Sequence, residues 1–301
     1  MRFCGIELAH PVINGSGTFD AIAAHRAFGD ALLAEFPFAA FVSKTVTLQP
    51  RQGNPPPRLW ELPAGLMNSI GLPNKGLERY LAEDLPWLAA RLPVPLVVNV
   101  MGFGREEVAT LVEAFAPREE VAALELNVSC PNVETGLIMG ADPGEVAGLL
   151  ERVRPLTAKP LIVKLTPNAT DPGAVAEAAA AAGADALSLI NTIVGTALHP
   201  RTGTPWLGGG TGGVSGPAVR AIALAQVRDV AQRTGMPIVG MGGVQSGSHA
   251  LDMIRAGATL VGVGTESFRD PGAAARIREE LAEAAEAADG VRFAPGAGHA
   301  R

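Results

Sequence analysis

The sequence predicts an α/β protein built as a single (β/α)8 barrel. Short, continuously apolar runs recur along the 301 residues, and segments with helical spacing lie between most of them. Strands that are apolar on both faces are typical of a parallel sheet covered by helices, and about eight such units form a closed barrel. No linker or shift in composition divides the chain, so we expect one domain over residues 1–301, with a flexible tail from about residue 290.

Eight segments fit the strands of this barrel. Each is an apolar run that ends in a small or polar residue, as a buried strand does at the edge of a sheet. In chain order they are 11–17, 41–45, 95–100, 123–127, 160–165, 186–191, 237–243 and 260–265. A doubly wound sheet is the alternative, but it normally uses fewer strands.

The helices between these strands have clear signals. Segment 143–154 has Asp142 as a candidate N-cap, Pro143 at its first position and apolar residues at helical spacing. Three more helices are expected, of which the first two also open on a proline, at 172–182, 217–233 and 271–288.

Two connections are too long to be simple loops between a strand and a helix. They span residues 46–80 and 191–216, and both are rich in glycine and proline. Barrel enzymes carry their substrate loops at the carboxyl ends of the strands, so we interpret both segments as such loops. A disordered surface excursion is the alternative, which apolar residues such as Trp60 and Trp206 disfavour.

Composition and charge narrow the class of partner. The formal net charge is −6 and there is no basic run, which argues against binding to nucleic acid and favours a small molecule. Two cysteines, Cys4 and Cys130, cannot form a disulfide framework, so we expect a cytosolic protein. No signal peptide and no membrane span are expected, and the five histidines show no metal-ligand spacing.

Polar side chains gather where the strands end. Seven of them are expected on one face of the barrel: Ser16, Lys44, Thr45, Asn99, Asn127, Lys164 and Asn191. A lysine is rarely buried without a partner, and an anionic ligand would be one. Pairing of each lysine with a neighbouring carboxylate is the alternative.

Glycines follow the last two strands, at Gly242, Gly243 and Gly264, and Gly216 lies ahead of a proline on the preceding loop. Backbone N–H groups can approach a phosphate closely there, and this is the usual phosphate site of barrel enzymes. Flavin mononucleotide (FMN) fits, with Lys164 near the N1/O2 edge of its ring. Cys130 would then lie opposite the ring face, either as an inert thiol or, as we favour, as a general base.

These segments resemble the dihydroorotate dehydrogenases over nearly the whole chain. The resemblance is carried by "NGSGTF", "SKTVTLQPRQGNPPPR", "MNSIGLPN", "ELNVSCPN", "VKLTPN", "INTIVG", "GGVSGPA", "GMGGV" and "GVGT". The pattern is most similar to the class 1 enzymes of the NAD-linked type (1B), in which a cysteine is the base.

The resemblance implies a role for each matching residue. FMN would be held by Ser16, Lys44, Thr45, Asn99, Asn127, Lys164, Ile190, Gly216, Gly242, Gly243, Gly264 and Thr265. Dihydroorotate would be held by Lys44, Asn68, Ser69, Ile70, Gly71, Leu72, Asn127, Asn132, Asn191 and Thr192. Ser69 departs from the family pattern, which more often has alanine there. Cys130 would remove a proton from C5 while hydride passes from C6 to flavin N5, giving orotate. Segment 134–145 would act as a lid.

The resemblance also implies a partner. The chain has no cysteine cluster for an iron–sulfur centre and no dinucleotide fingerprint, so we expect FAD and a 2Fe–2S cluster on a separate subunit, in a tetramer of two catalytic and two partner chains. The alternatives are a fumarate-linked class 1A homodimer and a related dihydropyrimidine dehydrogenase. An FMN-dependent RNA-modifying enzyme and a flavin-binding module without chemistry are more distant alternatives.

Overall fold

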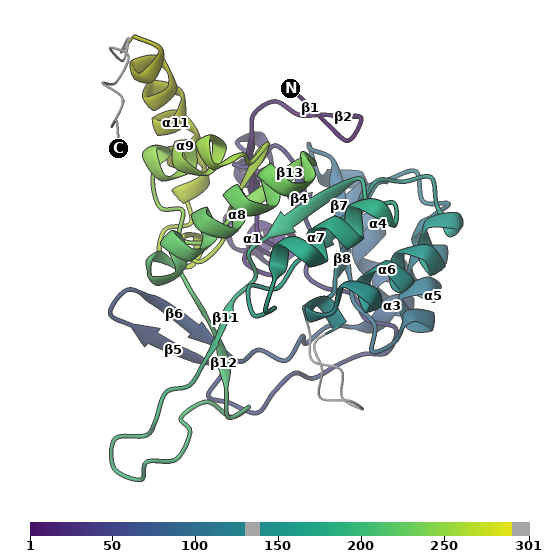
Figure 1. Cartoon of the computed structure of the whole chain (residues 1–301), viewed down its shortest axis with the longest axis horizontal. Coiled ribbons are helices and arrows are strands. Elements are labelled where there is room, and N and C mark those ends of the chain that lie inside the picture. Colours follow the sequence, from purple (N-terminus) through teal and green to yellow (C-terminus); the bar gives the residue numbers. More distant parts are fainter. Residues whose placement is uncertain (130–138, 291–301) are drawn as a thin grey trace, which may run out of the picture.

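The predicted barrel is present in the computed structural model, which describes residues 1–129 and 139–290 (Figure 1). Within these residues eight parallel strands form one sheet in the order β3-β14-β13-β10-β9-β8-β7-β4. Every strand overlaps one of the predicted segments, so the prediction of a barrel is confirmed. The strands are β3 Val12–Asn14, β4 Phe41–Val42, β7 Leu96–Val100, β8 Val121–Asn127, β9 Leu161–Lys164, β10 Ala186–Leu189, β13 Ile238–Met241 and β14 Leu260–Val263.

Helices cover the outside of this sheet (Figure 1). The α-helices are α1 Ala21–Phe28, α2 Ala31–Ala34, α3 Gly76–Arg79, α4 Leu85–Arg91, α5 Arg105–Phe115, α6 Pro143–Val153, α7 Pro172–Ala181, α8 Arg220–Thr234, α9 Gly247–Ala256, α10 Glu266–Arg269 and α11 Ala273–Gly290. The short turns are a π-helical η1 Tyr80–Asp84 and the 3-10 turns η2 Met139–Ala141, η3 Arg154–Leu156 and η4 Pro217–Val219.

The helix ends follow the sequence signals with one difference. Asp142 caps α6 as predicted, because its carboxylate accepts from the backbone N–H groups of Gly144 and Glu145 at 2.7 and 3.0 Å. The helix expected from residue 217 begins instead with a 3-10 turn, and α8 starts at Arg220. Tighter turns of this kind are common at helix N-termini.

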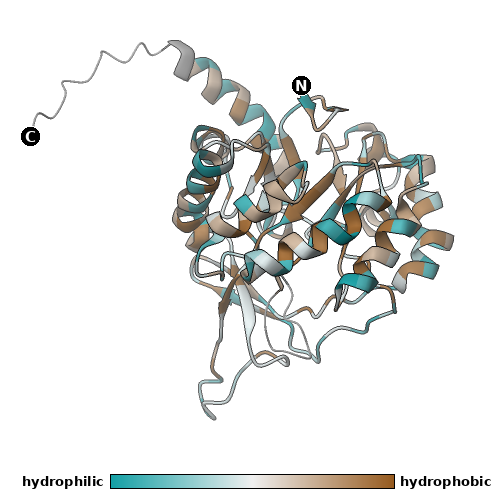
Figure 2. Cartoon of the chain, turned by 45° about the vertical axis from the view of Figure 1, so that its right-hand side comes forward, coloured by the Kyte–Doolittle hydropathy of each residue, from teal (hydrophilic) through white to brown (hydrophobic). Residues whose placement is uncertain are grey.

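The barrel interior is apolar at the end where the strands begin, which we call the lower half. Alternate residues of the strands point inward, among them Val97, Ala123 and Ile162, and they pack with Phe3 and Leu8. Phe3 belongs to a small hairpin, β1 Arg2–Phe3 and β2 Ile6–Glu7, that closes this end of the barrel. Figure 2 shows hydrophobic strands inside and more hydrophilic helix surfaces outside.

Asn14 joins the first and last strands of the sheet order. β3 and β4 form no ladder, but the Asn14 side chain accepts from the backbone N–H of Val42 and donates to its carbonyl, both at 2.8 Å. The side chain is fully buried. It therefore takes the place of the ladder hydrogen bonds that would close the barrel.

The two long connections form a second sheet. Its strands, in the order β11-β12-β6-β5, are antiparallel, and they are β5 Leu59–Leu62, β6 Gly65–Asn68, β11 Ile193–Gly195 and β12 Gly212–Ser215. Figures 1 and 2 place this sheet at the end of the barrel opposite β1 and β2. Trp60 and Trp206 pack at 4.8 Å between ring centroids. The alternative of a disordered excursion is therefore wrong for these segments.

None of the helices in the described part of the chain is long and apolar enough to cross a membrane.

Candidate active site at the carboxyl ends of the strands

Glycines from three loops meet beyond β13 and β14. A Cβ placed on Gly243, whose φ is +72°, would lie 2.8 Å from the carbonyl oxygen of Gly216, and one on Gly216 would lie 3.4 Å from the Thr265 side chain. A Cβ on Gly242 would lie 3.1 Å from Ile190. The structure thus brings together Gly216, Gly242, Gly243 and Thr265, and a side chain at any of these three glycines would clash with its neighbours; we call this group the glycine cradle.

Polar links hold this cradle in shape. The Thr265 hydroxyl donates to the Ser215 hydroxyl at 2.8 Å, which ties β12 to the end of β14. Behind the cradle, the Gln245 amide donates to Glu266 at 2.8 Å and connects the loops that follow β13 and β14. The helical segment of η4 and α8 begins directly after Gly216, so its N-terminal end adds a favourable position for an anion.

The predicted lysines differ in their surroundings. Lys164 is 5% exposed at the end of β9, and it lies in register with Asn127 on β8 and Ser188 on β10. Lys44 is exposed. Neither lysine forms an ion pair with a carboxylate in residues 1–129 or 139–290, so the alternative of structural pairing has no support there.

Three residues from the first strands are linked at the mouth. The Ser16 hydroxyl donates to the backbone carbonyl of Ser43 at 2.8 Å, and the backbone N–H of Asn99 donates to the Ser43 hydroxyl at 3.1 Å. Thr45 is buried beside them. Ser43 was missed in the sequence, although it lies inside the "SKT" motif.

Amide side chains line the opposite side of the mouth. The Asn127 side-chain oxygen accepts from the Ser129 hydroxyl at 2.6 Å, and the Asn191 amide also donates to that hydroxyl. The backbone N–H of Thr192 donates to the Asn191 side chain at 2.8 Å. Asn168, which the sequence did not single out, donates to the Thr192 carbonyl at 3.0 Å and holds this segment in place.

Two other residues of the first long connection, Asn54 and Asn74, form hydrogen bonds to the loop 68–72. The Asn54 amide donates to the Ser69 hydroxyl at 2.9 Å, and the Asn74 amide donates to the Leu72 carbonyl at 2.9 Å. Ser69 is buried, so its hydroxyl has a use that the alanine of the family pattern would not have. The Asn68 amide donates to Gly213 of β12 at 3.3 Å, which joins this loop to the second sheet.

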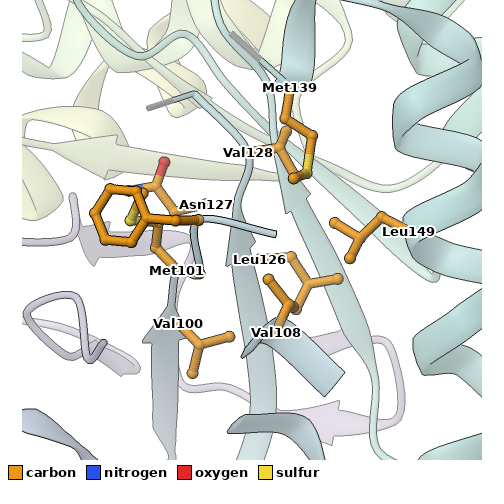
Figure 3. Close-up of a pocket in the computed structure, with 10 residues that line it drawn as sticks. Val100, Met101, Val108, Leu126, Asn127, Val128, Met139 and Leu149 are labelled. Atoms are coloured by element: carbon orange, nitrogen blue, oxygen red, sulfur yellow. The ribbon is translucent and has the colours of Figure 1, made fainter. Parts of the chain in front are cut away.

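A small pocket lies beside the end of β8. Figure 3 shows Leu126, Val128, Met139 and Leu149 around it, and its volume is about 10 Å³. A space of this size holds at most about one water molecule. We therefore interpret it as a gap in the packing of β8 against α6, not as a ligand site.

Of the two cysteines, only Cys4 lies within the described residues. Burial, with a smaller contribution from the nearby Asp185, raises the pKa of the Cys4 thiol to about 11, so Cys4 stays a neutral thiol at physiological pH. Cys130, Asn132 and residues 134–138 of the predicted lid lie outside the described residues, whereas residues 139–145 of that segment form η2 and the start of α6.

The fold and the site are those of a (β/α)8-barrel enzyme in which glycine loops and asparagine amides meet at the carboxyl ends of the strands. Residues 1–284 match the family model described as dihydroorotate dehydrogenase, and the chain belongs to this family. The resemblance seen in the sequence is thereby confirmed.

Several relatives share the name dihydroorotate dehydrogenase B (NAD(+)), catalytic subunit. The relative from Streptococcus pneumoniae serotype 4 is 44% identical over 281 residues, which are 92% of this chain and 89% of the relative. The relative from Pelobacter propionicus is 45% identical over 282 residues, 93% of this chain and 91% of the relative. The relative from Geobacillus kaustophilus is 43% identical over 268 residues, 89% and 84% of the two chains.

Proposed function

We propose that this chain oxidises dihydroorotate to orotate in pyrimidine biosynthesis, as the catalytic subunit of an NAD-linked dihydroorotate dehydrogenase. The family match and relatives of 43–45% identity support the reaction and the NAD-linked type. One observation supports the proposal most: the glycine cradle, the asparagine amides and the buried Lys164 all lie at the carboxyl ends of the barrel strands. The barrel and its second sheet act as one domain in this proposal.

FMN fits the residues of this site. The glycine cradle offers backbone without side chains, as a close phosphate contact needs, the side-chain oxygen of the fully buried Asn99 has no partner among the described residues, and Lys164 is buried without a described counter-ion. When bound, FMN would supply the acceptor for the hydride that leaves the substrate. The residues proposed to hold it are Ser16, Lys44, Thr45, Asn99, Asn127, Lys164, Ile190, Gly216, Gly242, Gly243, Gly264 and Thr265.

The chain's own residues bind and orient the substrate. Asparagine amides offer a donor and an acceptor to the ring amides of dihydroorotate, and the exposed ammonium of Lys44 can meet its carboxylate. The second sheet and the loop 68–72 shield the mouth from water. The proposed substrate residues are Lys44, Asn68, Ser69, Ile70, Gly71, Leu72, Asn127, Asn132, Asn191 and Thr192.

Cys130 is the proposed general base at C5. In the sequence it directly follows Ser129, whose hydroxyl donates to Asn127 and accepts from the Asn191 amide. A thiolate there would take the proton while the amides keep the ring flat.

Electrons must leave the chain for NAD. The relatives are catalytic subunits by name, which supports a second subunit for this chain as well. We propose that the partner carries FAD and a 2Fe–2S cluster and that two chains of each kind assemble. The expected cytosolic location, which rests on the cysteine count, belongs to the same proposal.

The acceptor assay tests this function. The FMN-loaded chain is mixed with dihydroorotate and an artificial dye acceptor, and orotate is measured by its ultraviolet absorbance. We expect orotate with the dye, little with NAD alone, and NAD reduction once an electron-transfer subunit is added. Rapid turnover of the isolated chain with fumarate would contradict the NAD-linked assignment, and no orotate with any acceptor would contradict the reaction.

A further inference from the structure

The carboxylate of Glu125 lies inside the barrel and has no part in the proposed function so far. Its side chain projects from β8, two residues before Asn127, and is 3% exposed. The apolar side chains of the lower barrel, such as Val97 and Ile162, lie on one side of it. A buried carboxylate is costly unless hydrogen bonds or an opposite charge stabilise it. A carboxylate between the apolar lower barrel and the polar strand ends therefore indicates a specific role.

The two side-chain partners that the structure gives this carboxylate are neutral donors. The Ser188 hydroxyl donates to one oxygen at 2.7 Å, and the Asn99 amide nitrogen donates to the other. Asn99 and Glu125 are in register on the adjacent strands β7 and β8. Because the Asn99 amide nitrogen donates to this carboxylate, its NH₂ group and not its oxygen faces Glu125. Glu125 thereby fixes which way the Asn99 amide points.

The orientation of the Asn99 amide decides the surroundings of its oxygen. The Asn99 side-chain oxygen is buried and has no hydrogen-bond partner among the described residues. On the neighbouring strand the amide of Asn127 is turned the opposite way, because its oxygen is occupied by the Ser129 hydroxyl. Asn99 thus keeps a fixed acceptor that is unpaired among the described residues, and the Asn127 amide nitrogen remains a donor.

We propose that Glu125 is a positioning residue that holds Asn99 as an acceptor, so that the site selects a ring bearing an N–H group at this point. The proposal rests on the proposed function, because it takes the ring to be that of FMN. The pyrimidine portion of a flavin carries an N–H between two carbonyl groups, which is the pattern that an acceptor beside donors recognises. An unpaired buried acceptor would otherwise cost the site free energy, so this contact favours binding.

Exchanging the donor and the acceptor between the two positions tests this role. In Glu125→Gln the Asn99 amide can turn, since glutamine offers both a donor and an acceptor. In Asn99→Asp two carboxylates meet. In the double variant the new glutamine donates to the new aspartate, which again presents an oxygen to the mouth, and the net charge equals that of the wild type.

The readout is the FMN dissociation constant of the apo chain, measured by quenching of flavin fluorescence, with thermal melting as a check on folding. Glu125→Gln should weaken binding roughly 3- to 10-fold and Asn99→Asp more than about 10-fold, whereas the double variant should return to within about threefold of the wild type. Ser188→Ala, which leaves the Asn99 contact in place, is the control and should stay within about twofold.

Two results would overturn the inference: a double variant that binds FMN no better than Asn99→Asp, or a Glu125→Gln variant that binds like the wild type. A purely structural role for Glu125 predicts no rescue. If the wild-type chain binds no FMN at all, the proposed function itself fails, and this outcome is distinct from the other two.

Discussion

Replacing Asn14 by alanine should weaken the barrel, because this side chain closes the seam between β3 and β4. It makes two hydrogen bonds of 2.8 Å to the backbone of Val42, one to the N–H and one to the carbonyl. Both residues are buried, so water does not readily replace the lost partner. The substitution therefore leaves two buried backbone groups unpaired.

The size of the effect follows from these two groups. Each unpaired buried group costs about 1–3 kcal/mol, so the free energy of unfolding should fall by about 2–6 kcal/mol. This is a large share of the roughly 5–15 kcal/mol of a typical domain. With a urea dependence of about 3 kcal/mol per molar, the midpoint should move down by roughly 0.7–2 M.

Urea unfolding followed by circular dichroism measures this shift, with and without added FMN. Thr110→Ala is the control, because among the described residues its hydroxyl bonds only to the Glu106 carbonyl of its own exposed helix face, and it should change stability by less than about 0.5 kcal/mol. If Asn14→Ala shifted the midpoint no more than this control, the reasoning about the seam would be refuted.

Four further predictions concern the site and its surroundings. Lys164→Met should raise the melting temperature of the apo chain, because a buried cation is lost, yet weaken FMN binding about tenfold or more; unchanged FMN affinity would contradict the role given to Lys164. Gly243→Ala should also weaken FMN binding, because its φ of +72° and the close Gly216 carbonyl oppose a side chain, whereas Gly104→Ala, with open space around it, should not. Cys130→Ala should leave FMN bound but slow flavin reduction roughly 10²-fold, and an unchanged rate would remove this thiol from the mechanism. Burial, aided by the neighbouring Arg220 guanidinium, lowers the pKa of His249 below its ordinary 6.5. As the pH falls, the unfolded chain therefore binds the proton before the folded chain does, so the free energy of unfolding is full above about pH 6.5 and decreases below it. His249→Gln should make this decrease smaller in urea unfolding measured at several pH values.

The barrel could be predicted because its strands carry the signal within themselves. Segments such as 95–100 and 160–165 are apolar on both faces, which only a parallel sheet covered by helices satisfies. The N-cap of α6 was also visible, because Asp142 and Pro143 act on the adjacent backbone. Local chemistry decided these features.

The second sheet could not be predicted in the same way. Its strands have three or four residues, and β12 reads as a glycine-rich turn in the sequence. It forms because β12 pairs with β6, which lies some 150 residues earlier in the chain, as in the register of Gly213 with Asn68. Long-range pairing of short strands leaves little local pattern.

The sequence singles out candidate residues near the strand ends but not the residues that lie behind them. Asn99, Asn127 and Lys164 end strands and are polar, which marks them as candidates. Glu125 lies inside an apolar strand, although its spacing of two residues from Asn127 places both on the inner face, and that signal could have been used. The role of Asn14 depends on Val42, whose position only the closed barrel determines.

The most direct test of the account is to mix the FMN-loaded chain with dihydroorotate in the absence of oxygen and to follow the visible absorbance of the flavin. The account predicts that the yellow absorbance bleaches as the substrate is oxidised and that orotate appears in equal amount. A chain that binds FMN and stays fully oxidised at saturating dihydroorotate would contradict the proposed reaction.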